Sequence, residues 1–204
     1  MQAPKHISDR ISFVKKPDEL TVVISQEIPK KKEALLFTWI MAWLFVGIAF
    51  IFYFFTSPPE SDEKIFFAVT VAFWAFFFFR MAKVFYWRRA GIELLRVKED
   101  YLTIKNAFGK YGKARMYQIE NIQKFGTIPY DFTKYGQFLD RSFWEMGGET
   151  VGFEHFNKSV RFGKQLSEKE SKQLAKLLDK AMRDIPAGFN RKISDAIEEN
   201  ADQT

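Results

Sequence analysis

Two uncharged apolar runs near the N-terminus constrain the fold of this chain more than any other feature. Residues 34–55 contain no charge and would form a helix of roughly 33 Å at ~1.5 Å per residue, enough to cross a hydrocarbon core of ~30 Å. A second run, 65–87, can continue past Arg80 and Lys83 if these side chains snorkel outward. Because only residues 56–64 separate the runs, the sequence predicts a transmembrane helical hairpin.

The basic residues beside these runs predict the orientation of the hairpin. Lysines and arginines flank its two outer ends, whereas the connecting loop carries Glu60, Asp62 and Glu63 against Lys64. Under the positive-inside rule, both termini are cytoplasmic and the loop lies outside. The predicted membrane-boundary residues are Lys30, Lys31, Lys32, Arg80, Lys83, Arg88 and Arg89.

Strand patterns lie on both sides of the apolar hairpin. Residues 10–15 and 20–26 alternate apolar and polar side chains and are separated by a turn at Pro17. Two strands alone are marginally stable in water, so we expect them to pair with strands that follow the membrane segment. Those later strands are predicted at 92–97, 101–108, 114–119, 122–129, 150–156 and 159–162.

A single amphipathic helix follows the last strand. Ser167 and Glu170 have the spacing of a capping box. The apolar stripe behind them comprises Leu174, Leu177, Leu178, Ala181 and Met182. Pro186 and Gly188 predict the end of the helix. The fold class is therefore a membrane α-helical hairpin plus an α+β domain, built as a bent antiparallel sheet or half-barrel capped by one C-terminal amphipathic helix.

The domain boundaries follow from these elements. We assign 1–32 to N-terminal strands of the cytoplasmic domain, 33–87 to the membrane hairpin, 88–186 to the rest of the domain, and 187–204 to a flexible tail. The hairpin then interrupts the strand order of one domain.

Four segments give the chain a resemblance to a known family. They are PDELTVVI (17–24), ELLRV (93–97), FEHFNKSVRFG (153–163) and QLSEKE (165–170). With these segments the chain resembles bacterial PH-like membrane proteins, in particular a little-characterised group with a transmembrane hairpin. Asn157 stands where that family tends to have glycine. The resemblance implies a PH-like fold in the bacterial inner membrane and implies no enzymatic activity.

The region from Arg96 to Lys124 is the best candidate for contact with lipids. It contains seven basic residues against three acidic ones, and a cation near an anionic leaflet gains up to ~1 kcal/mol. The candidate lipid-facing residues are Lys105, Lys110, Lys113 and Arg115. The alternative is a generic positive surface on a domain tethered close to the membrane.

The connection 130–149 is the best candidate for a protein interface because it is long and rich in aromatic residues. The candidate interface residues are Tyr135, Phe138, Phe143 and Trp144. The alternative is that these side chains fold back onto the sheet or enter the membrane interface.

Enzymatic motifs are missing from the sequence. The chain has no cysteine and two histidines, and it contains no P-loop, nucleophile-elbow or His-Glu-x-x-His pattern. His155 falls beside a predicted hairpin turn and is interpreted as structural. We therefore predict no catalytic residue, no metal site and no cofactor. The net charge of +6 is assigned to membrane topology and surface, so no nucleic-acid partner is expected.

These observations favour a binding protein over an enzyme. The leading hypothesis is a membrane-anchored cytoplasmic PH-like binding or scaffold module, an accessory subunit of a larger inner-membrane complex with membrane-protein partners. The alternative hypothesis is a sensor of anionic phospholipid headgroups at the cytoplasmic leaflet.

Overall fold

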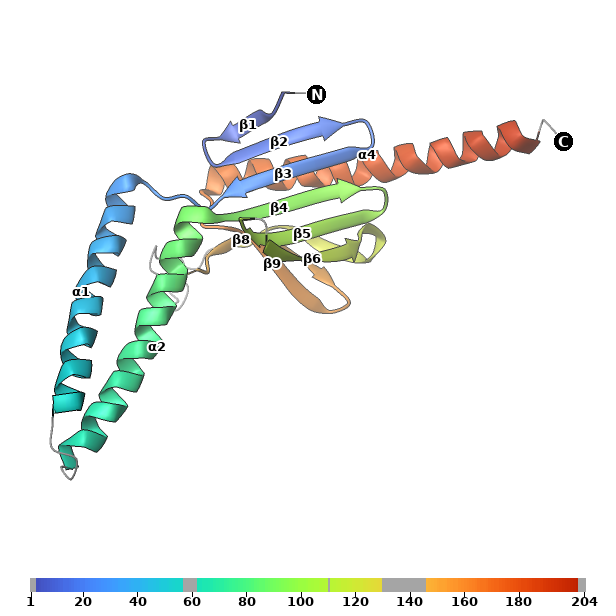
Figure 1. Ribbon diagram of the computed structural model, residues 1–204. Coiled ribbons are helices and arrows are strands. Elements are labelled where there is room, and N and C mark those ends of the chain that lie inside the picture. The colour runs from blue at the N-terminus through green and yellow to red at the C-terminus, as the bar shows by residue number, and fades with distance from the viewer. Residues whose placement is uncertain (1–2, 57–61, 110, 130–145, 202–204) are drawn as a thin grey trace.

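A computed structural model describes residues 3–56, 62–109, 111–129 and 146–201. It contains an apolar helical hairpin joined to an antiparallel β domain (Figure 1). The elements in chain order are β1 (Lys5–Ser8), β2 (Ile11–Lys16), β3 (Glu19–Ser25), α1 (Lys30–Thr56), α2 (Asp62–Ala90), β4 (Gly91–Lys98), β5 (Tyr101–Phe108), β6 (Tyr111–Gln118), the short 3₁₀ helix η1 (Ile119–Asn121), β7 (Ile122–Thr127), β8 (Glu149–His155), β9 (Lys158–Lys164) and α4 (Glu168–Ala201).

The hairpin helices α1 and α2 are both long and apolar enough to cross a membrane. Most of their large apolar side chains are exposed, as lipid-facing side chains are in a spanning helix. The two helices approach closely at Gly47, where an added Cβ would lie 1.9 Å from the Trp74 ring. The Trp74 indole N–H also donates to the Trp43 carbonyl oxygen at 2.7 Å. Small residues at the contact between two membrane helices let the helices approach closely.

The β domain is assembled from segments on both sides of the hairpin. Strand β3 pairs antiparallel with β4 along its whole length, from Glu19 opposite Lys98 to Ser25 opposite Ile92. The predicted pairing of residues 10–26 with the later strands is therefore present. Sheet A has the order β1-β2-β3-β4-β5-β6. Helix α1 follows β3, and α2 precedes β4. Because β3 and β4 are neighbours in the sheet, the two helices leave the domain side by side (Figure 1).

A second sheet covers the apolar face of the first. The chain turns at η1 and enters sheet B, with the order β7-β8-β9. The core between the sheets and α4 contains side chains with almost no exposed surface, including Leu95, Leu102, Phe153 and Phe162. In the described residues β6 and β9 are edge strands of different sheets, so the assembly is open and does not close into a barrel.

Helix α4 packs across the back of the strands. Its predicted capping box is present, since the Ser167 hydroxyl accepts from the Glu170 N–H at 3.2 Å and the Glu170 carboxylate accepts from the Ser167 N–H at 2.8 Å. Leu174 and Leu178 are completely buried. Figure 1 shows the C-terminal half of the helix projecting beyond the sheet.

Three details differ from the sequence predictions. Strand β1 was not predicted, because four residues are too few for a recognisable alternation. The turn of the last hairpin is centred on Phe156 and Asn157, which both have positive φ, one residue earlier than predicted. The predicted helix end at Pro186 is wrong, and α4 continues to Ala201. Proline removes one backbone donor, but Ile185 is anchored in the core, and residues 191–199 beyond Gly188 include several helix formers such as Lys192, Ala196 and Glu198.

Candidate functional site

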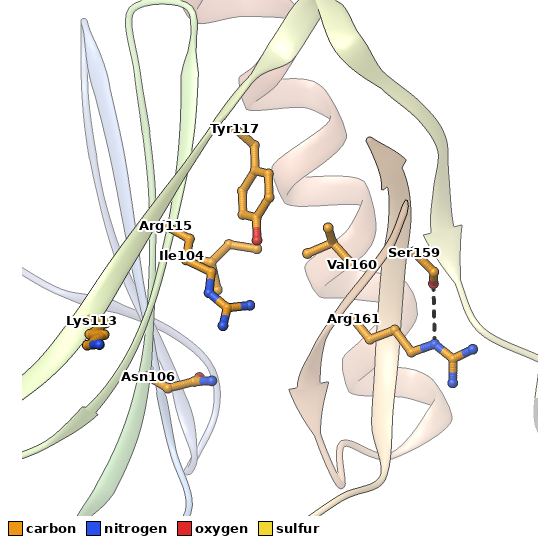
Figure 2. A pocket seen from close by; sticks show the side chains of 8 residues that line it. All are labelled: Ile104, Asn106, Lys113, Arg115, Tyr117, Ser159, Val160 and Arg161. Atoms are coloured by element: carbon orange, nitrogen blue, oxygen red, sulfur yellow. Dashed lines mark hydrogen bonds between the residues drawn. The ribbon is translucent and has the colours of Figure 1, made fainter. Parts of the chain in front are cut away.

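The open side of the β domain contains a basic cleft of about 290 Å³. We define the basic cleft by its lining residues, which are Ile104, Asn106, Lys113, Arg115, Tyr117, Ser159, Val160 and Arg161. Strands β5 and β6 provide one wall and β9 provides the other (Figure 2). The site therefore lies where the two sheets fail to join.

Strand register explains why basic side chains line a wall that continues the core. Lys113 lies opposite Asn106, Arg115 opposite Ile104, and Tyr117 opposite Leu102. Side chains alternate between the two faces of a strand, and Leu102 is completely buried. Lys113 and Arg115 thus belong to the same face as the core but lie beyond its edge, where both side chains are exposed.

Apolar and aromatic side chains form the inner end of the cleft. Ile104 is 8% exposed, and the Tyr117 ring meets the rings of Phe153 and His155 edge-on, each at 5.2 Å between centroids. Figure 2 shows Tyr117 hanging from the β6 wall toward the gap. Ring packing fixes Tyr117, so the inner end is rigid and apolar while the mouth is polar.

The opposite wall, β9, carries the third basic residue that borders the cleft, Arg161. Val160 belongs to the inner face of β9, in phase with Phe162, whereas Ser159 and Arg161 belong to the outer face. Figure 2 shows the side chains of Ser159 and Arg161 pointing away from the β5–β6 wall. The Arg161 Nε–H donates to the Ser159 hydroxyl at 3.4 Å (Figure 2). Among the lining residues there are three cations and no carboxylate. This arrangement suits an anion, because Arg and Lys donors match phosphate and carboxylate oxygens.

The structure divides the four predicted lipid-facing residues. Lys113 and Arg115 line the basic cleft together, and Lys110 lies outside the described residues. Lys105 pairs with Ala114 and therefore belongs to the opposite face of the sheet, so it does not line the basic cleft. Arg161 was missed, because it is distant in sequence and the only sequence signal was a basic residue beside a predicted hairpin.

The predicted protein interface is not described by the structure. Tyr135, Phe138, Phe143 and Trp144 all lie outside the described residues. The interpretation of His155 as structural stays a prediction. Its ring also packs against Phe156, at 4.6 Å between centroids.

A second and larger groove lies beside the start of α4, but its polar groups already interact with one another. The Arg10 guanidinium donates to the carbonyl oxygens of Ser25, Lys164 and Gln165. The Glu170 carboxylate accepts from Ser167. The Arg10 bonds tie the β1–β2 connection to β3 and to the end of β9, and the Ser167–Glu170 bonds cap α4. We therefore interpret this groove as structural and the basic cleft as the functional site.

Most of the predicted boundary residues lie at the end of the hairpin that meets the β domain, whereas Arg80 and Lys83 lie farther along α2, toward its middle. Lys30, Lys31, Lys32, Arg80, Lys83 and Arg89 are exposed. Arg88 is the exception, since only 1% of its surface is exposed. The helix turns Arg88 toward the β domain, where Arg10 and Glu93 lie within electrostatic range.

The junction between hairpin and domain is held by buried polar contacts. The Lys164 ammonium sits 4.8 Å from the centre of the Trp87 ring, and the Gln26 N–H donates to the Gly91 carbonyl oxygen at 3.0 Å. One Glu93 carboxylate oxygen accepts from the Gly163 N–H at 2.8 Å and from the Lys164 N–H at 3.4 Å. These contacts fix the direction in which the β domain leaves the hairpin.

Glu93 makes the stability of this junction depend on pH. Burial raises the pKa of Glu93, although the Lys164 charge and the two N–H donors oppose the rise. The folded protein therefore holds a proton more tightly than the unfolded chain, whose glutamates titrate near ~4.3. The contribution of Glu93 to stability is fully present below that value and is lost as pH rises through the folded pKa.

Glu93→Gln should remove this pH dependence. Relative to wild type, the variant should gain stability with rising pH, by ~1.4 kcal/mol for each unit by which the pKa is raised. Thermal unfolding of the full chain in detergent, followed by circular dichroism across the acidic range, measures the difference. Glu19→Gln is the matched control, and its effect has the opposite pH dependence. The hydrogen bond from Arg96 lowers the pKa of Glu19, so in wild type the contribution of Glu19 to stability is lost as pH falls. Parallel wild-type and Glu93→Gln profiles would contradict the assignment.

Comparison with known proteins adds no identity. No family model matches the chain, and neither a curated protein nor a solved structure matches it.

Proposed function

We propose that this chain is a membrane-anchored binding module that recognises anionic phospholipid headgroups at the leaflet on which its β domain sits. The single observation that carries the proposal is the basic cleft, with Lys113, Arg115 and Arg161 in its lining and no carboxylate among the residues that line it. The hairpin supplies the anchor, and the open PH-like half-barrel supplies the site.

The position of the cleft supports a lipid ligand. In Figure 1 the strands of sheet A follow one another from β1 to β6 in the direction in which the hairpin extends, and β9 lies on that same side. A membrane around the hairpin would therefore lie closer to β6 and β9 than to β1 and β2. A headgroup in that leaflet is within reach of the cleft without any unfolding of the domain.

The chemistry of the cleft fits a phosphate-bearing headgroup. Arginine can bind two oxygens of one phosphate, and lysine adds a compact charge. Each cation near an anionic surface is worth up to ~1 kcal/mol, so Lys113 and Arg115 together correspond to about 30-fold in affinity. The apolar inner end formed by Ile104 and Tyr117 would accommodate the glycerol carbons next to the phosphate.

Lipid retention tests the proposal. The full chain is extracted in a neutral detergent with a mixture of phosphatidylglycerol and phosphatidylcholine, and bound lipids are counted by native mass spectrometry. Wild type should keep phosphatidylglycerol selectively, and the Lys113→Gln/Arg115→Gln variant should keep about 10- to 30-fold less.

Lys105→Gln is the matched control, because Lys105 lies on the neighbouring strand and on the opposite face of the sheet. It should leave lipid retention unchanged. The proposal would be refuted if Lys105→Gln and Lys113→Gln/Arg115→Gln lost equal amounts of bound phosphatidylglycerol, or if wild type lost all bound lipid at moderate salt. Either result would mean that lipid is held by generic surface charge.

The proposal includes an orientation. We place both termini and the β domain in the cytoplasm of a bacterial cell and the 56–64 connection outside the inner membrane, on the basic flanks of the hairpin. A protease site inserted at Pro17, in the exposed β2–β3 turn, should be cut only from the cytoplasmic side. Cleavage from the external side would show that the orientation is the opposite of the one proposed.

The second candidate function is an accessory or scaffold subunit of a larger inner-membrane complex. The observation that favours it is strand β6, which is exposed at every residue except Tyr117. Such a module should copurify with other membrane proteins after gentle extraction, and a strictly monomeric particle under several mild conditions would count against it.

A further inference from the structure

The free edge of β6 differs from the sheet edges formed by β1 and β7 in the described part of the chain. Strand β1 is four residues long and its register shifts between His6 and Ser8, and the register of β7 shifts between Gln123 and Gly126. Short length and bulges are devices that protect an edge from pairing. Strand β6 has eight residues, contains no proline and keeps an unbroken register with β5.

The backbone groups that point away from β5 can be assigned from the hairpin register. Phe108 lies opposite Tyr111 across a two-residue connection, so these two residues exchange both of their backbone hydrogen bonds. Hydrogen-bonded pairs and non-hydrogen-bonded pairs of residues then alternate along the β5–β6 ladder. The N–H and C=O groups of Gly112, Ala114 and Met116 therefore point outward, away from β5.

The side chains along this edge specify the charge of an added strand. On the cleft side, the neighbours of an added strand are Lys113 and Arg115. On the other side they are Ala114 and Met116, and Met116 is 71% exposed. Cross-strand pairs are favourable for opposite charges and unfavourable for like charges. A matching strand thus alternates acidic with apolar residues.

A second copy of β6 does not fit this requirement. Antiparallel pairing of two β6 strands would bring Lys113 and Arg115 of one chain beside the same cations of the other, without a carboxylate in the strand to compensate. Charge complementarity selects a different protein.

We propose that β6 is a docking edge for an extended acidic segment of a partner protein, which joins sheet A as an additional strand at the mouth of the basic cleft. The segment donates and accepts backbone hydrogen bonds at Gly112, Ala114 and Met116, and its carboxylates face Lys113 and Arg115. This is strand addition, and it goes beyond headgroup binding because it uses the backbone of β6.

A pair of synthetic peptides tests the proposal with the full chain in neutral detergent micelles. One peptide alternates Glu with Val over the length of β6, and the other alternates Lys with Val. Amide hydrogen exchange of residues 111–118, measured by mass spectrometry, should slow at least tenfold with the Glu/Val peptide and stay unchanged with the Lys/Val peptide. Equal protection by both peptides, or protection by neither, would overturn the proposal.

Two variants separate backbone pairing from charge. Ala114→Pro removes an outward N–H and leaves the bonds to β5, so it should abolish protection by the Glu/Val peptide while phosphatidylglycerol retention persists. Lys113→Glu/Arg115→Glu should reverse the preference toward the Lys/Val peptide. If Ala114→Pro does not fold, the test rests on the Lys113→Glu/Arg115→Glu variant. If this charge-reversed variant still prefers the Glu/Val peptide, strand docking is refuted.

Discussion

Deleting residues 1–26 should unfold the β domain, although it leaves the hairpin and every later strand in the chain. The deletion removes β1, β2 and β3 and exposes the edge of β4 along its whole length. Four of the lost side chains are completely buried in the core: Ile11, Leu20, Val22 and Ile24. Burial of such a side chain is worth ~1.5–3 kcal/mol, so the loss is roughly 6–12 kcal/mol, as large as the whole stability of a typical domain at ~5–15 kcal/mol.

The measurement is the β-sheet signal in circular dichroism of the truncated chain in detergent, together with its resistance to protease. Deleting only residues 1–4, which precede β1, is the matched control and should leave the melting temperature unchanged within error. A truncated chain that melts at the wild-type temperature would mean that the first strands are not part of the β-domain core.

Phe162→Ala should destabilise the β domain by ~3–5 kcal/mol. Phe162 is 1% exposed, and its ring lies 6.2 Å from that of Phe153 and 6.3 Å from that of Phe125, between centroids. The substitution would leave a cavity where β7, β8 and β9 meet. Chemical denaturation of the full chain in detergent, followed by circular dichroism, measures the change in the free energy of unfolding.

The control substitution lies in the same hairpin. Phe156 is 71% exposed at the β8–β9 turn, so Phe156→Ala should change stability by no more than ~0.5 kcal/mol. Similar losses from the two substitutions would show that the β8–β9 hairpin is not packed as described.

The sequence was sufficient for the hairpin and for most strands, because both depend on short-range patterns. The length of an uncharged apolar run shows whether it can span a membrane. The alternation of apolar and polar side chains along residues 10–26 predicts strands with one buried face. Even the pairing across the hairpin could be inferred, because Phe13 and Ile24 had no other core to join. The capping box at Ser167 was equally local.

The grouping of the site residues depended on register, which the local pattern does not contain. Lys105 and Lys113 are equally basic, but β5–β6 pairing assigns them to opposite faces. Arg161 joins the site only because β9 returns beside β6. Sequence reasoning grouped Lys105 with Lys113 and Arg115, because charge can be read from sequence whereas the direction of a side chain cannot.

The membrane junction shows the same division between sequence and tertiary structure. By sequence, Arg88 and Arg89 are equivalent boundary residues, and their charge together with that of the lysines before α1 predicts the topology. In the folded chain Arg89 is exposed and pairs with Glu33, at 3.9 Å between the charged atoms, whereas Arg88 is buried. Sequence thus determined that charge gathers at this end of the hairpin. Only the packing of α2 against the β domain decided which arginine faces water, because successive residues on a helix point about 100° apart.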